Sequence, residues 1–184
     1  LKLFLNFFIN HGLFKLKNRP QWYTVTNRSK FYVKKILEKI SGEIFKNYKI
    51  NNISRSDNNV RITIGNEYLD YDHVVLACHA DQSLNILEEP TVKEKEILNK
   101  FTYGSNRAFL HTDKNLMPLR KKAWSSWNSI TKENKTCVTY WLNKLQNLKT
   151  DKNYCLTLNP VINIDENKIM KQEKFTHPYF NNKN

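Results

Sequence analysis

Residues 73–78 of this 184-residue chain read His73-Val74-Val75-Leu76-Ala77-Cys78, and no polar residue interrupts the run after His73. A strand with one solvated face alternates apolar and polar residues, whereas an unbroken run is typical of a strand buried on both faces of a mostly parallel sheet. Just upstream, residues 60–64 do alternate, and a Gly-Asn turn follows them. These patterns predict a buried strand over 73–78 beside an antiparallel hairpin.

The segments before this hairpin predict two helices and two strands. Apolar residues at positions 1, 4, 5, 8 and 9 lie on one face of a helix, and Gly12 suits the left-handed position that ends one. A strand is predicted over 21–26, a helix from Ser29 to about residue 40, and a strand over 48–55.

The segments after residue 78 predict a second region with its own sheet. A short helix is expected over 81–87, and Thr91 to Glu94 form a capping box that begins another helix. Strand candidates cover 106–112, 122–128, 136–142 and 154–158, and a last helix is predicted over 165–174. Glu88-Glu89-Pro90 marks a domain crossing, so the predicted fold class is mixed α+β.

The net charge of +13 would suit a nucleic-acid partner, but the kind and distribution of the cations argue against one. There are 24 Lys and only 6 Arg, the Lys are scattered, and Arg is the usual reader of bases and phosphates. The three cysteines form no Cys-x-x-Cys pair and no metal-ligand spacing, which favours buried structural thiols in a reducing, cytoplasmic setting. We therefore expect no nucleic-acid partner and no metal.

Several strings of the sequence carry more information than its periodicity does. They are Asn10–Leu13, Arg19–Val25, Ser29–Val33, His73–Gln82, Asn106–Asp113, Ala123–Asn128, Val138–Asn147, Thr157–Pro160 and the pair His177-Pro178. In these strings and in their order the chain resembles a bacterial branch of the flavin amine oxidase superfamily, usually described as predicted NAD/FAD-binding proteins. The resemblance runs in register over nearly the whole chain.

The resemblance implies an FAD-dependent oxidoreductase of which this sequence is an interior piece. Family members begin with a Rossmann FAD fingerprint and end with a Gly-rich segment that closes over the flavin. Here the four glycines, at 12, 42, 65 and 104, are too far apart for Gly-x-Gly-x-x-Gly. On this basis residues 1–18 would be a helical segment of the substrate or cap region, 19–88 a partial FAD-binding, Rossmann-like domain, and 89–184 a substrate-binding domain truncated at its C-terminus.

The resemblance also implies cofactor-binding residues. Ile50 would contact the adenosine half of FAD, and the backbone of Ala77 and Cys78 would lie at the carboxyl end of the buried strand, where open α/β sheets bind ligands. The alternative is that Ile50 is a core residue. The family usually has a Gly-Gly pair before its Ser-x-x-Tyr-Val helix, whereas this chain has Asn27-Arg28, which weakens the expectation of a close backbone approach to the cofactor at this turn.

Three residues are candidates for the substrate cavity. Aromatic side chains often wall the cavity over the flavin ring in this superfamily, which would be the role of Trp127 or Tyr140, although a simple core role is the more economical explanation. His111 lies in the predicted strand over 106–112, where a single histidine is more often a hydrogen-bonded structural residue than a catalyst. No catalytic residue is identified.

The resemblance thus predicts transfer of a hydride from a substrate C–H bond to the flavin, for which no acid or base is obligatory. Many amine oxidases of the superfamily have a Lys near the reactive nitrogen of the flavin, and the equivalent stretch 106–109 has none. Small-molecule or lipid-like substrates other than amines therefore stay open. The alternative, from a different class, is a basic nucleic-acid- or anionic-lipid-binding module without enzymatic activity.

The expected location is the cytoplasm. The apolar stretch over residues 3–9 is too short to span a bilayer and is followed by no small-residue cleavage site. It predicts a helix packed on a domain or, alternatively, a helix that lies on the surface of the inner membrane. The sequence predicts no particular oligomeric state.

Overall fold

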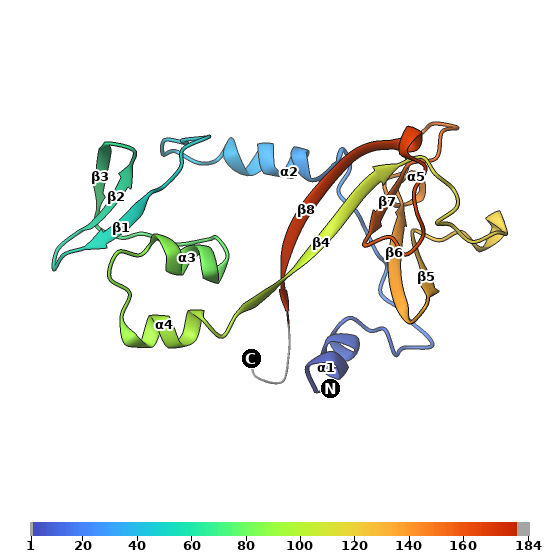
Figure 1. Cartoon of the computed structure of the whole chain (residues 1–184), viewed down its shortest axis with the longest axis horizontal. Coiled ribbons are helices and arrows are strands. Elements are labelled where there is room, and N and C mark those ends of the chain that lie inside the picture. Colours follow the sequence, from blue (N-terminus) through green and yellow to red (C-terminus); the bar gives the residue numbers. More distant parts are fainter. Residues whose placement is uncertain (1, 180–184) are drawn as a thin grey trace.

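The structure, a computed structural model, describes residues 2–179, and in this range it is a mixed α+β fold with two antiparallel sheets. The smaller sheet comprises β1 (Asn52–Arg55), β2 (Val60–Ile64) and β3 (Glu67–Tyr71), in that order. The strands of the larger sheet are β4 (Thr102–His111), β5 (Trp127–Lys132), β6 (Lys135–Trp141), β7 (Cys155–Leu158) and β8 (Ile169–Tyr179). Their spatial order is β5-β6-β7-β4-β8, and Figure 1 shows the two sheets at opposite ends of the molecule.

Helices precede the sheets and connect them. The helices α1 (Lys2–Asn10) and α2 (Arg28–Leu37) come before the smaller sheet, whereas α3 (Ala80–Ile86) and α4 (Val92–Leu98) lie between the sheets in sequence and in space (Figure 1). A short α5 (Leu142–Leu145) follows β6, and 3-10 turns at Lys121–Ala123 and Glu166–Lys168 precede β5 and β8. No helix within residues 2–179 is long and apolar enough to cross a membrane.

The strand β4 organises the larger sheet because it pairs on both sides. Its second half pairs with β7, from Ala108↔Leu158 to His111↔Cys155, and its whole length pairs with β8, from Thr102↔Tyr179 to His111↔Ile169. The predicted helix over 165–174 is therefore wrong, since most of this stretch belongs to β8. Backbone pairing with a strand about 60 residues away in sequence outweighs a weak local helical pattern.

Two other predicted strands are not formed, and a third begins late. Residues 21–26 and 73–77 form no strand, and 122–128 contains a 3-10 turn before β5 begins at Trp127. Val75 is 89% exposed, so the prediction of a strand over 73–78 buried on both faces is wrong, as is that of a mostly parallel sheet. A ladder needs a neighbouring strand for its N–H and C=O groups, and residues 2–179 provide none beside 73–77.

One face of the larger sheet forms the core. The alternate residues on this face are Phe109, His111, Cys137, Thr139, Cys155 and Thr157, all of them buried. Leu116, Trp124 and Ile164, from the loops after β4 and β7, pack against it. The prediction of buried thiols is thus confirmed for Cys137 and Cys155 but is wrong for Cys78, which is exposed.

A chain of polar side chains crosses this core. His111 Nε2 and Thr157 Oγ1 lie 2.8 Å apart, as do the hydroxyls of Thr157 and Thr139, and the backbone N–H of Asp113 donates to His111 Nδ1 at 3.1 Å. Because Nδ1 accepts, the neutral ring carries its proton on Nε2 and donates it to Thr157. Burial lowers the pKa of His111, so this histidine is a neutral structural residue.

A bidentate ion pair links the smaller sheet to α4. Arg55 donates to both carboxylate oxygens of Glu94, at 2.7 and 3.0 Å, and to the carbonyl oxygen of Glu89 at 2.9 Å. Glu94 also forms the predicted capping box with Thr91, which begins α4. Hydrogen bonds from Arg55 and Thr91 lower the pKa of Glu94 to about 2.

We expect Glu94→Gln to lower the free energy of unfolding by about 1 kcal/mol at neutral pH, because the amide weakens both the cap and a partly exposed ion pair. The folded pKa is lowered, so this contribution is present above the usual value of 4.5 and is lost as the pH falls toward about 2. Urea unfolding at neutral and acidic pH measures it. The control Glu96→Gln, on the same helix, should change little; equal losses for both variants would contradict the role of Glu94.

Thr157→Val should destabilise the chain by about 1–3 kcal/mol, because it leaves the buried Nε2–H of His111 without its acceptor. The matched control is Thr131→Val, which removes an exposed hydroxyl pair with Thr136 and should change stability by less than about 0.5 kcal/mol. Since the folded pKa of His111 is lowered, its stabilising contribution is present above 6.5 and declines as the pH falls below it. Urea unfolding measures the loss of stability in both variants. Equal losses for Thr157→Val and Thr131→Val would contradict the role of Thr157 as the acceptor for His111.

Candidate functional site

The face of the larger sheet opposite the core is open. Residues in register on neighbouring strands share a face, and on this face they are Ala108, Leu110, Val138, Tyr140, Leu156 and Leu158. All of them except Ala108 are only partly buried, in contrast with the residues of the core face. The result is a partly exposed apolar surface that crosses β4, β7 and β6.

Aromatic rings extend this surface to the edge strand β5. Trp127 is paired with Tyr140, and their rings meet edge to face with centroids 6.0 Å apart. Trp127 is 64% exposed, whereas Trp124 is 8% exposed and packs edge-on against Trp141 in the core. The structure therefore divides the aromatic candidates: Trp124 and Trp141 are core residues, whereas Trp127 and Tyr140 lie on the open face.

His111 does not lie with these two residues. It is on the core face, is 0% exposed and has Thr157 and Asp113 as its partners. A ligand on the open face would be separated from it by the sheet itself. The structural explanation of His111 is therefore favoured over a place in the substrate cavity.

The open face has a polar margin that the sequence analysis did not single out. Asn106 accepts a hydrogen bond from Asn159 at 2.7 Å, and its amide lies 2.9 Å from Nδ1 of His177. Because the oxygen of Asn106 is already an acceptor, its amide donates to Nδ1, and the neutral His177 ring then carries its proton on Nε2. In the sequence, the pair His177-Pro178 pointed to this margin. The pair lies beside β4 because residues 169–179 form β8, a strand that the sequence did not predict.

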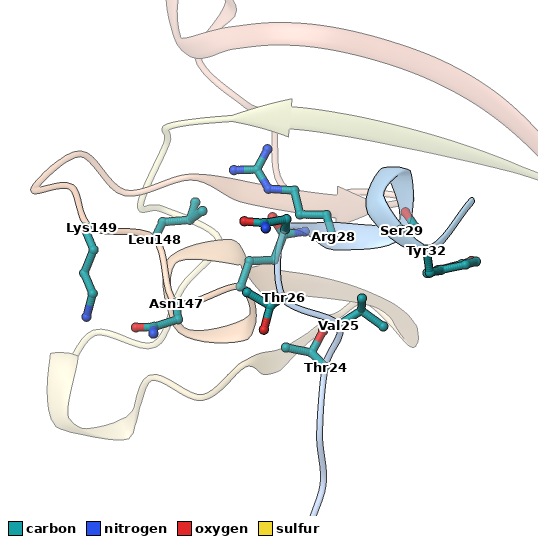
Figure 2. A pocket seen from close by; sticks show the side chains of 11 residues that line it. Thr24, Val25, Thr26, Arg28, Ser29, Tyr32, Asn147, Leu148 and Lys149 are labelled. Carbon is teal, nitrogen blue, oxygen red and sulfur yellow. The ribbon is translucent and has the colours of Figure 1, made fainter. Parts of the chain in front are cut away.

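A cavity of about 630 Å³ lies where the chain enters α2 (Figure 2). Its walls are residues 24–29 and Tyr32 on one side and the loop 146–149 after α5 on the other. Asn27 and Arg28 have φ values of 63° and 69°, in the left-handed region. Glycine adopts such angles freely and asparagine adopts them readily, whereas for arginine they cost about 1–2 kcal/mol, so Arg28 is the unusual residue of this turn.

The electrostatics of this cavity suit a polar or anionic group. Asn27 occupies the N-cap position of α2, but its side chain accepts no hydrogen bond from the helix. The first N–H groups of α2 therefore have no side-chain cap. Figure 2 shows Arg28 and Lys149 on opposite walls, and both add positive charge to that of the helix terminus.

The three cofactor-binding candidates are accessible but are not gathered into one site. Ile50 is 37% exposed and precedes β1, which argues against the core alternative. Ala77 and Cys78 are exposed and immediately precede the N-cap of α3, and Cys78 Sγ lies 3.2 Å from the hydroxyl of Ser83. No hydrogen bond in the described part of the chain joins Ile50 to Ala77 or Cys78.

Comparisons with known proteins bear on the fold. No family model and no curated protein matches the chain. Among solved structures it is similar to the CLA-producing fatty acid isomerase from P. acnes, with a TM-score of 0.54 and 14% identity, over 83% of this chain and 40% of that one. At this identity the likeness shows the fold alone. The chain thus shares the fold of part of an enzyme and spans about two fifths of its length.

Two tryptophans test the division between the faces. Trp124→Ala should lower the free energy of unfolding by about 3–5 kcal/mol, because it empties a buried site and removes the hydrogen bond to the carbonyl of Pro118. Trp127→Ala should change it by less than about 0.5 kcal/mol, because most of that side chain is already in water. Denaturant unfolding compares the two variants, and a large loss for Trp127→Ala would show that its face is part of the core.

Proposed function

We propose that the chain is part of an FAD-dependent oxidoreductase of the flavin amine oxidase type and supplies much of its substrate side. The observation that carries this proposal is the left-handed pair Asn27-Arg28. It stands where the superfamily usually has Gly-Gly before the Ser-x-x-Tyr-Val helix. Asparagine adopts such angles readily, but arginine does so at a cost, so Arg28 keeps a backbone path that glycine would follow freely. The fold shared with part of an enzyme supports the coarser proposal that the whole protein is an enzyme.

The described residues suit the adenosine half of FAD but not its pyrophosphate. Ile50, Ala77 and Cys78 are exposed, and the unpaired stretch 73–77 leaves backbone groups available, as binding of the adenosine half requires. A pyrophosphate needs glycines at close spacing, and the four glycines of this chain are far apart. The phosphate-binding Gly-x-Gly-x-x-Gly unit would therefore be supplied by another segment.

When bound, FAD supplies the acceptor for a hydride taken from a substrate C–H bond. The residues of this chain would orient the substrate and exclude water. Trp127 and Tyr140 would wall the cavity, and Leu110, Leu156 and Leu158 extend it with apolar surface. This composition favours a lipid-like or otherwise apolar small molecule, a class that includes the fatty acid named for the structural neighbour.

The exposed apolar side chains of α1 extend the proposal to contact with a membrane surface. Phe4, Phe7 and Ile9 are each more than half exposed, although α1 is too short to span a bilayer. A helix of this kind packs on another domain or lies at a membrane surface. Peripheral contact of a cytoplasmic enzyme with the inner membrane would bring it to a lipid-like substrate.

The flavin content of the protein tests the proposal. The 184-residue chain alone should bind FAD weakly or not at all, whereas the product of the whole open reading frame should purify yellow with stoichiometric flavin. In that product Trp127→Ala should slow flavin reduction by substrate without loss of bound FAD, as followed by absorbance at the flavin band.

Two results would contradict the proposal. A whole-gene product that stays colourless with excess FAD would exclude the flavoprotein. Polyanion binding that weakens steeply with salt would instead favour the basic binding module, because released counterions drive that association.

A further inference from the structure

The core side of the larger sheet has a notch where β7 ends early. The ladder between β7 and both of its neighbours stops at Leu158, which pairs with Ala108 and Val138. On either side β4 continues to Thr102 and β6 to Lys135. The chain leaves the sheet at Asn159-Pro160. A cavity of about 600 Å³ lies at this point, where β7 no longer separates β4 from β6.

Basic side chains surround this notch. Arg107, Lys132 and Lys135 line the cavity, with Glu133 as the carboxylate among them. None of the three cations forms an ion pair with a residue of the described range 2–179. The Arg107 guanidinium lies over the Phe109 ring, 5.0 Å from its centroid, which holds the cation at the wall.

Like charges face each other across the strands at two points beside this notch. Lys132 is directly paired with Lys135, and Arg107 with Lys174. Directly opposed charges of one sign destabilise a sheet, and neither pair is relieved by a carboxylate in an ion pair. An anion bound in the notch would offset the repulsion between Lys132 and Lys135 and would neutralise Arg107, the one member of the second pair that lines the cavity.

From this arrangement we infer that the notch binds the phosphate group of a small phosphorylated molecule. A phosphate carries about two negative charges at neutral pH and matches the fork of an arginine. It therefore suits the three cations and one carboxylate that line the notch better than a singly charged carboxylate does. A second cavity of about 540 Å³ shares Arg107 and Pro160 and is lined by apolar side chains such as Phe109 and Ile162 and by polar ones, Asn163, Glu166 and Gln172. It provides room for the remainder of the ligand.

This site is independent of the proposed flavin chemistry. Arg107 is on the same side of β4 as Phe109 and His111, whereas Trp127 and Tyr140 lie on the opposite face. Loss of one function would therefore leave the other intact. The site would be regulatory or would hold a second small molecule, and it needs no cofactor.

Binding of inorganic phosphate to the 184-residue chain, followed by ³¹P line broadening at constant ionic strength, tests the inference. Arg107→Gln should weaken binding about tenfold, because charge-assisted hydrogen bonds are lost. The matched control Arg120→Gln removes the same charge from an exposed loop and should stay within about twofold. Acetate should compete poorly with phosphate.

The double variant Lys132→Gln/Lys135→Gln provides a second readout. It should also weaken phosphate binding. In a chloride buffer without phosphate it should unfold at the same or a higher temperature than the wild-type chain, because the repulsion between Lys132 and Lys135 is removed. Equal weakening by Arg107→Gln and Arg120→Gln, non-saturable binding, or equal competition by acetate would overturn the inference. A double variant that binds phosphate normally would do the same.

Discussion

The backbone ladder between β4 and β8 is the interaction on which the rest of the second region depends. It holds β4 in one register from Thr102 to Leu110, with a single irregularity between Leu110 and His111, and the side chains of a strand point alternately to its two faces. Phe109 and His111 consequently enter the core, while Ala108 and Leu110 face the open side. A slip by one residue would exchange the two sets, so the core, the aromatic surface and the basic notch all follow from one register.

The polar chain of His111, Thr157 and Thr139 helps to fix that register. These side chains come from three neighbouring strands and satisfy one another only when the strands are aligned as observed. Leucines at the same places would bury more apolar area, but they would tolerate other alignments. A buried polar network that is fully satisfied favours a single arrangement, and here it does so at the place where the two faces of the sheet receive different roles.

Local patterns in the sequence predicted the elements whose causes are local. The antiparallel hairpin that begins at residue 60, the capping box at Thr91 and the left-handed Gly12 all appear in the structure as expected. Residues 169–174 became a strand, and 73–77 did not, because each outcome depends on whether a distant segment offers a ladder. The same limit applies to the candidate site. Trp124 and Trp127 are three residues apart and have opposite environments. Trp124 lies in the loop before β5 and packs in the core, whereas Trp127 begins β5 on its open face.

The order in which the strands appear along the chain has a consequence during synthesis. The β4 strand is translated long before β8, and the two pair over their full length. Until β8 has left the ribosome, β4 lacks its partner on this edge, and contacts between residues so far apart in sequence form slowly. The nascent chain would therefore present an unpaired edge of β4 between the synthesis of His111 and that of Ile169–Tyr179. This is the state in which edge-to-edge association competes with folding, so a trigger-factor-like chaperone would have its greatest effect within that interval.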